Sequence, residues 1–528
     1  MQIALIFVLL LTFVLGLGLL ARRLAIPYPI LFVIGGLFIG FIPILPTQLS
    51  LDPNLIFFLI LPPLLYIQAF YTSWRDFRFY LRPILLLAIG LVIATTVTVA
   101  YVAHWLIPGL PLSAGFVLGA IISPPDAVAA SAIAQRLGLP RRIVTILEGE
   151  SLVNDATSLV IFKVALAAVG AVAPLLGRAW IPGEFCYVSI GGIAVGLVVA
   201  RLISWVRRRV INDGPQIALT VSLLTPYVSY LLADQFLHVS GVLSVVATGL
   251  YLGWQAPDVL NSNIRLQAQA FWEMIIYLLN GTVFVLIGLQ LPGILHSLQE
   301  PLWPRPVLYA LVINTVCILI RLAWIFPGAY LPRLFKKIRE TEPPPDWRHV
   351  AIVGWCGMRG IVSLAAALTL EGYPEFPHRH LVQFIAFSVI LTTLVFQGLT
   401  LPALIQFLGI GDDGISAREE IEARKHISDV VFAKIAEVRR DEEFPASAID
   451  TIENSYRERS LVLGDALADE LGWSHQRHHV LSTRRLRHLM IAAQRRALVA
   501  LRRTGSIGDD VMHKIEHELD LEEARLKN

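Results

Sequence analysis

The stretch Ile121-Ile122-Ser123-Pro124-Pro125-Asp126-Ala127 places two consecutive prolines and a carboxylate inside an apolar segment that runs from about residue 114 to 133. Each proline removes a backbone donor and fixes φ, so the sequence predicts a break in the helix here. The break leaves backbone carbonyl oxygens available beside Asp126. In a membrane, a broken helix next to an acid is typical of the cation sites of secondary transporters.

A second polar motif, EGESLVNDATS at 148–158, opens the next apolar segment at about 145–170. Ser151, Asn154, Asp155 and Ser158 follow the spacing i, i+3, i+4 and i+7, which places them on one face of a helix. One carboxylate with hydroxyl and amide oxygens suits a hard monovalent cation. The same carboxylate can hold a proton instead. The motif therefore predicts a site that either ion can occupy.

A third motif, GWCGMRG at 354–360, lies inside the apolar segment 350–371 and carries the basic residue Arg359. Its three glycines permit close backbone approach or local unwinding. A charge at this depth needs a partner, and we predict a structural ion pair between Arg359 and Glu150. Lys163 lies about two turns beyond Asp155. The sequence leaves open whether its ammonium competes with the cation or extends to the membrane surface.

Composition shows that these motifs belong to a membrane protein with a charged tail. Of the 528 residues, 55% are hydrophobic and 16% are charged, against about 25% charged in soluble proteins. Residues 412–528 nevertheless hold 19 of the 43 Lys and Arg and 23 of the 40 Asp and Glu. We therefore predict a transmembrane domain over 1–411 and a helical cytoplasmic tail over 412–528, whose expected role is regulatory.

The distribution of Lys and Arg predicts the number and direction of the spans. About 20 apolar residues cross a bilayer as a helix, and we count thirteen such stretches. Alternate loops are rich in basic residues, and these loops should face the cytoplasm. The N-terminus is then outside and the tail inside. The basic loops carry Arg22 and Arg23, Arg75 to Arg82, Arg136 to Arg142, Arg207 to Arg209, Arg265, and Arg333 to Arg339.

Several function classes are not supported by the sequence. No dense basic face suggests a nucleic-acid partner, and no nucleotide-binding loop or other enzyme motif is present. The three cysteines suit neither a disulfide framework nor a metal cluster. We expect no cofactor.

The motifs together resemble the monovalent cation:proton antiporters, and most closely the electroneutral Na+/H+ exchanger branch with its NhaP-type members. The resemblance rests on SPPDAVAA (123–130), EGESLVNDATSLV (148–160), FWEMIIYLLNGTVFVLIGLQL (271–291) and GMRGIVSLAAAL (357–368), and it covers essentially all of residues 1–411. It implies thirteen spans with inverted repeats, two broken and crossing helices, and a homodimer in the plasma membrane.

Carried over residue by residue, the resemblance implies that Asp155 binds the transported Na+, with Asn154 as its neighbour. Asp126, Ser151 and a backbone oxygen near Pro125 would complete the site, and Glu150 with Arg359 would support it. The chain departs from the family at two places. Where members of the family often carry a threonine, this chain has Pro125, so the threonine hydroxyl is missing.

The second departure lies in the third span. An acid frequent in relatives is replaced by the neutral Ile67, beside Gln68.

These observations predict one-for-one exchange of Na+ or Li+ for H+ across the plasma membrane by alternating access. K+/H+ exchange on the same scaffold is the closest alternative, because a set of oxygen ligands does not fix the cation radius. An ion channel with a regulatory tail and a solute:cation symporter are further alternatives. A channel would not need a proton-binding carboxylate.

Overall fold

The computed structural model consists of helices joined by short connections, and the residues that it describes contain no strand. In the first part of the chain the described residues are 2–24, 27–42, 56–169, 181–210, 214–259, 262–298, 304–341 and 344–411. In the tail they are 415–440, 445–454, 456–457 and the single residues 491, 494 and 519. The chain divides into two compact units, Met1–Asp412 and Asp413–Asn528.

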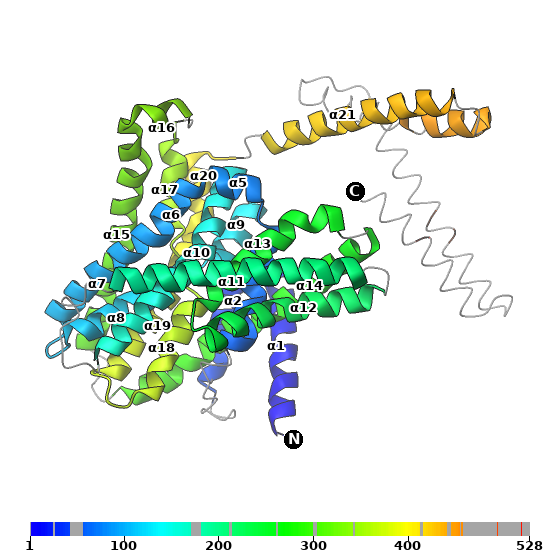
Figure 1. Cartoon of the computed structure of the whole chain (residues 1–528). Coiled ribbons are helices and arrows are strands. Elements are labelled where there is room, and N and C mark those ends of the chain that lie inside the picture. The colour runs from blue at the N-terminus through cyan, green and yellow to red at the C-terminus, as the bar shows by residue number, and fades with distance from the viewer. Residues whose placement is uncertain are drawn as a thin grey trace. The chain divides into compact units, whose positions relative to one another are not determined.

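The first unit is a bundle of helices (Figure 1). In chain order these include α1 (Gln2–Leu24), α2 (Tyr28–Gly40), α4 (Leu61–Tyr71), α7 (Val92–Leu106), α10 (Arg141–Val169), α11 (Ile181–Val210), α12 (Pro215–Leu231), α13 (Gly241–Val259), α14 (Ser262–Ser297) and α15 (Arg305–Tyr330). Shorter helices at their ends are α5 (Trp74–Phe79), α6 (Leu81–Leu85), the 3-10 turn η5 (Leu331–Leu334) and α16 (Lys336–Thr341). Between α6 and α7 runs the π-helical segment η2 (Leu86–Leu91), and η4 (Leu232–Phe236) extends α12 in the same way.

Length and composition make this unit a multi-pass membrane domain. Eight helical segments among the described residues are long and apolar enough to cross a bilayer, and four shorter apolar helices accompany them. The prediction of an all-α polytopic membrane protein is confirmed. The count of thirteen spans stays a prediction.

Two segments of the bundle are interrupted, as the proline and glycine motifs predict. The first is α8 (Leu112–Ile122) followed by α9 (Ala127–Arg136), and residues 123–126 between them are not helical. The second is α17 (Trp347–Trp355) followed by α18 (Ile361–Thr369), with residues 356–360 between them. Beyond α18, α19 (Arg379–Thr392), the π-helical segment η7 (Thr393–Gln397) and α20 (Gly398–Leu408) end the unit.

Small residues bring other helices of the bundle into close contact. A Cβ added at Gly36 of α2 would overlap the Val285 carbonyl oxygen of α14, and one added at Gly288 of α14 would overlap the Val33 carbonyl oxygen of α2. Membrane helices approach closely through such residues, because lipid supplies no hydrophobic force that drives helices together. The pair α2–α14 therefore packs backbone against backbone.

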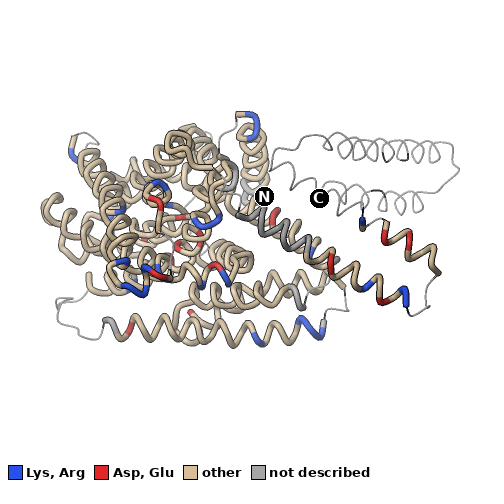
Figure 2. Tube along the Cα trace, turned by 90° about the horizontal axis from the view of Figure 1, so that it is seen from above, with Lys and Arg blue, Asp and Glu red and all other residues tan. Residues whose placement is uncertain are grey.

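Charged residues are sparse along the bundle, and Figure 2 shows long stretches of its tube without a red or blue segment. The tail differs. Its helix α21 (Ile415–Val438) is followed by a turn and a second helical stretch that includes residues 446–454. Arg439 joins the two, because its Nη2 lies 2.7 Å from an oxygen of Asp450 and 2.7 Å from an oxygen of Glu453. The tail thus contains helices, as its sequence predicts.

Candidate functional site

The two breaks meet. The backbone N–H of Asp126 donates to the Met358 carbonyl oxygen over 2.6 Å. In the other direction, the Arg359 Nε donates to the Ile122 carbonyl oxygen over 3.0 Å. A Cβ added at Gly360 would overlap the Asp126 carboxylate, so glycine is required for this crossing. The two unwound segments hold each other by backbone and side-chain contacts.

Charges at the crossing lie at the ends of the half-helices. The Asp126 Oδ1 accepts from the Val128 N–H over 2.8 Å and so caps the N-terminus of α9. Arg359, through the bond to Ile122, lies at the C-terminus of α8. A helix carries a partial positive charge at its N-terminus and a partial negative charge at its C-terminus, so each charge faces an end of opposite sign. Two of the half-helix ends at the crossing therefore have their partial charges compensated.

Helix α10 holds this crossing from one side. The Asn154 Nδ2 donates to the Pro125 carbonyl oxygen over 2.7 Å, and the Ala127 N–H donates to the Ser151 Oγ over 3.3 Å. Asn154 and Ser151 are buried. The carbonyl that the proline motif frees is thus bound by Asn154, which fixes the broken segment to α10.

Asp155 faces a pocket of about 370 Å³ beside the crossing. Only 7% of the Asp155 surface is exposed. Three of the predicted ligands, Asp155, Asp126 and Ser151, line the pocket together. The remaining walls are Leu61, Leu64, Leu65, Gln68, Pro124, Val128, Gly360, Ile361, Val362 and Ser363. The structure thus brings two carboxylates and a hydroxyl to one small cavity. Pro125 itself does not line it.

A second hydroxyl faces this pocket, and sequence reasoning missed it. Ser363, on the first turn of α18, is 1% exposed, and its Oγ has no hydrogen-bond partner among the described residues. Leaving a buried hydroxyl unsatisfied costs about 1–3 kcal/mol. The hydroxyl is therefore available to an occupant of the pocket. The sequence could have pointed to Ser363, because it lies four residues after Arg359, at the start of the half-helix that follows the break.

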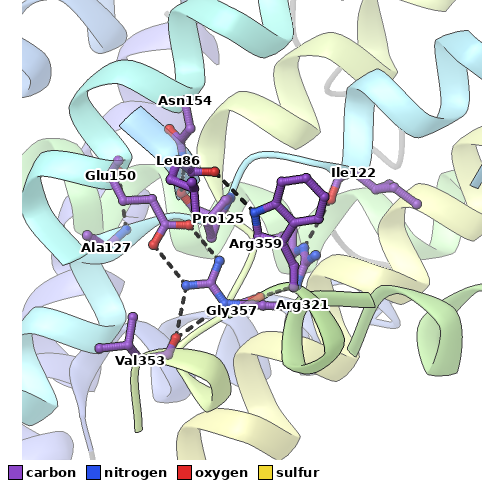
Figure 3. A network of polar contacts seen from close by, with 12 residues as sticks. Leu86, Ile122, Pro125, Ala127, Glu150, Asn154, Arg321, Val353, Gly357 and Arg359 are labelled. Carbon is purple, nitrogen blue, oxygen red and sulfur yellow. Dashed lines mark hydrogen bonds and ion pairs between the residues drawn. The ribbon is translucent and has the colours of Figure 1, made fainter. Parts of the chain in front are cut away.

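Glu150 lies one turn before Asn154 on α10, and its ion-pair partner differs from the predicted one. Arg321 of α15 contacts both carboxylate oxygens, with Nη1–Oε1 at 2.6 Å and Nη2–Oε2 at 2.9 Å. Both side chains are 2% exposed. Figure 3 shows the guanidinium between Glu150 and the Val353 carbonyl oxygen, which also accepts from Arg321.

The prediction that Glu150 pairs with Arg359 is therefore wrong. Arg321 occupies both oxygens of Glu150, and Arg359 donates instead to the carbonyl oxygens of Ile122 and Gly357. The predicted pairing leaves out Arg321, although this arginine also lies within the apolar segment 307–327. An arginine at that depth is a functional candidate by the same rule that selects the acids.

The chain matches the family described as "Sodium/hydrogen exchanger, transmembrane" over residues 8–407. It is 35% identical to an uncharacterised Na+/H+ exchanger of Mycobacterium tuberculosis, over 96% of this chain and 93% of that one. It is 32% identical to the uncharacterised Na+/H+ exchanger YjcE of Escherichia coli, over 95% and 94% of the two chains.

The chain belongs to the Na+/H+ exchanger family.

The fold agrees with this assignment. The sodium proton antiporter MjNhaP1 from Methanocaldococcus jannaschii superposes with a TM-score of 0.60 at 19% identity, covering 77% of this chain and 99% of that one. The exchanger is thus a multi-pass membrane protein with the fold of a monovalent cation:proton antiporter. Its family is one of transporters rather than enzymes.

Two further residues of this exchanger can now be placed. Lys163 pairs with Asp234, at 3.0 Å from Nζ to Oδ1, and 70% of its side chain is exposed. It does not line the pocket. In the third predicted span, Ile67 is buried in an apolar cluster, whereas Gln68 lines the pocket. Helix α4 thus offers the Gln68 amide to the site.

Proposed function

We propose that this exchanger carries Na+ in one direction and H+ in the other, with Asp155 binding either ion. The observation that carries the proposal is the meeting of Asp155, Asp126 and Ser151 in one pocket beside two broken helices. Carboxylate and hydroxyl oxygens are the ligands that hard cations prefer. Half-helix ends at such a site are typical of secondary transporters.

The proposed ligands are the Asp155 and Asp126 carboxylates and the Ser151 hydroxyl, with the Ser363 hydroxyl as a fourth. Asn154 acts as a positioning residue, because its amide binds the Pro125 carbonyl oxygen and thereby fixes the segment that carries Asp126. The backbone oxygen at Pro125 contributes through this bond. Glu150 and Arg321 keep the helices in register and do not contact the ion.

One-for-one exchange follows from the single shared carboxylate. When Na+ binds, Asp155 has lost its proton. When H+ binds, Na+ has left. Each occupant adds one positive charge to the same site, so the loaded site crosses the membrane with the same net charge in both directions. The exchange is then electroneutral, unlike the flux of a channel, which gives a current.

K+ is the second candidate cation. The relative from Bacillus subtilis, 35% identical over 72% of this chain and 58% of that one, is described as a sodium, potassium, lithium and rubidium/H+ antiporter. The pocket is lined by flexible side-chain oxygens rather than a rigid ring of carbonyls, and such ligands do not fix one cation radius.

The proposal also covers the membrane, the oligomeric state and the orientation of the transporter. We place it in the plasma membrane as a homodimer, with the N-terminus outside and a regulatory tail in the cytoplasm. The orientation rests on the basic loops. The exposed apolar side chains of α11, among them Tyr187, Ile190 and Val198, supply a face that lipid or a second copy can cover.

Transport by the purified protein in liposomes tests the function. An imposed proton gradient should drive uptake of radioactive Na+ without a change in membrane potential. Comparison of Na+, Li+ and K+ at equal concentrations gives the selectivity. Uptake that needs no proton gradient, or that generates a current, would contradict the proposal.

A further inference from the structure

The bundle contains a second and larger cavity, which shares no lining residue with the pocket of Asp155. The space between its walls measures about 840 Å³, part of which is open to the surroundings. It lies between the α5–α6 segment with η2, the first turns of α10, the end of α15 with η5, and the first turns of α17. We call it the basic groove.

The polar lining of the basic groove is cationic. Arg82, Arg142 and Arg333 line it from three different helical segments, and His349 lies on a fourth. None of the described residues that line it is acidic. The Arg142 guanidinium lies 5.7 Å from the centre of the Tyr80 ring, which also lines the groove. Arginines gathered around one cavity favour an anionic ligand, and above all a phosphate group.

The rest of the groove is apolar. Its lining includes Pro83, Leu86, Leu87, Ile143, Ile146, Ile325, Ala329, Val350 and Val353. A small soluble anion would leave this surface uncovered. A ligand with a charged head and a hydrocarbon chain would contact both parts. The lining therefore fits an amphiphile.

Neighbouring residues place the groove at the edge of the bilayer. Leu334 and Phe335 lie directly after Arg333, and they are 80% and 71% exposed. Lys336 and Lys337 follow them. Exposed apolar side chains next to lysines are typical of a segment that lies in the headgroup region of a membrane. A lipid can reach the groove from the side without leaving the bilayer.

We propose that the basic groove binds an anionic phospholipid of the leaflet that faces these basic helix ends. Its phosphate lies among Arg82, Arg142 and Arg333, and an acyl chain lies along the apolar lining. Basic pockets between transmembrane helices on the cytoplasmic side recognise anionic headgroups in this way. The proposal does not depend on which cation is exchanged.

The bound lipid stabilises the helices that hold the ion pair. The groove contacts α10 and α15, which carry Glu150 and Arg321, and it is lined by Val353, whose carbonyl oxygen accepts from Arg321. Leu86 also lines the groove, and its carbonyl oxygen accepts from the Trp324 Nε1 of α15 over 3.2 Å. A ligand that binds only the folded protein raises its stability, and the gain grows with the logarithm of the ligand concentration relative to Kd.

The test uses the full-length protein in a neutral detergent, with phosphatidylglycerol or phosphatidylcholine added. Phosphatidylglycerol should raise the melting temperature by on the order of 5 °C, and phosphatidylcholine should not. The double variant Arg142→Gln/Arg333→Gln should lose most of this rise. Arg208→Gln/Arg209→Gln removes the same charge from the end of α11, where both residues are exposed, and should keep it.

Three results would overturn the proposal. The first is an equal rise with both lipids, and the second is a full rise in the groove variant. The third is the same rise with soluble glycerol phosphate, which would assign the groove to a free anion. If the groove variant does not fold, a photoactivatable phosphatidylglycerol is applied to the wild-type protein. Its crosslinks should map to residues 79–87, 142–146, 325–333 and 345–353, and crosslinks confined to other segments would contradict the assignment.

Discussion

Glu150 and Asp155 lie five residues apart on α10, and both are buried, yet their surroundings differ. Both oxygens of Glu150 are bound by Arg321 in a bidentate pair. Asp155 faces a pocket that it shares with a second acid, Asp126. A carboxylate that is fully paired cannot exchange its partner cheaply, whereas one beside a cavity can accept an ion. The partner, more than the depth in the membrane, distinguishes a structural acid from a transporting one.

Asp155→Asn tests whether Asp155 is the acid that binds the transported ions. The amide keeps the shape of the side chain but cannot lose a proton to take up a cation, so we expect Na+/H+ exchange in liposomes to fall to background. Folded yield and melting temperature should stay close to those of the wild type, because the Asp155 side chain makes no hydrogen bond to the part of the chain that the structure describes. Retained pH-dependent exchange would move the site elsewhere, with Asp126 the first candidate.

Arg321→Ala tests the structural acid. It leaves the Glu150 charge buried without its partner, which costs about 3–5 kcal/mol. We expect a large loss of folded yield and melting temperature. The double variant Glu150→Gln/Arg321→Ala removes the uncompensated charge and should recover part of the loss. Arg359→Ala is the matched control for Arg321→Ala. It also removes an arginine, but this arginine donates to backbone carbonyl oxygens and not to Glu150, so Glu150 keeps its partner. Equal stability of wild type and Arg321→Ala would refute the structural assignment.

Ser363→Ala tests a smaller contribution to the proposed cation site. Loss of one neutral ligand should weaken the apparent Na+ affinity by about tenfold, which corresponds to about 1.4 kcal/mol, while the maximal rate changes little. The Na+ to K+ preference should change as well, which a purely structural role would not produce. Ser363→Thr keeps the hydroxyl and should restore most of the affinity.

The control for Ser363 is Thr96→Val, which removes another buried hydroxyl without a partner, at a residue that does not line the pocket. Its apparent Na+ affinity should match that of the wild type. An equal change of affinity in Ser363→Ala and Thr96→Val would show that Ser363 is not a ligand.

Truncation after Gly411 should have the mildest effect on the site. The described residues of the tail form charged helices of their own, and the residues that line the pocket all precede residue 364. We expect exchange by the truncated protein to remain measurable, with a change in rate or pH dependence. A truncated protein that inserts well but does not transport would show that the tail is required for exchange.

Local signals in the sequence predict the interruptions of the fold well. The pair Pro124-Pro125 and the glycines around Arg359 each predict a break, and both breaks are present at α8–α9 and α17–α18. The face made by Ser151, Asn154 and Asp155 follows from helical spacing alone. These features depend on a few neighbouring residues, so the sequence determines them without knowledge of the packing.

Pairings between distant segments could not be predicted in the same way. Both Arg321 and Arg359 are single arginines in apolar segments, and either could neutralise Glu150. The choice depends on how α15 packs against α10, which no local pattern records. The same limit applies to Ser363, because only the crossing of the two broken segments brings α18 to the pocket. Gln68 faces the pocket and Ile67 does not, and the difference of one residue depends on the rotation of α4.

If H+ and Na+ share Asp155, the two ions compete for it, and the kinetics of exchange reveal the competition. The initial rate of exchange in liposomes is measured as a function of Na+ concentration at a series of pH values. If one proton and one Na+ compete for Asp155, the apparent KM for Na+ rises as pH falls, tending to tenfold per pH unit at the acidic end, while the maximal rate at saturating Na+ is preserved. An apparent KM that does not change with pH would contradict a shared carboxylate.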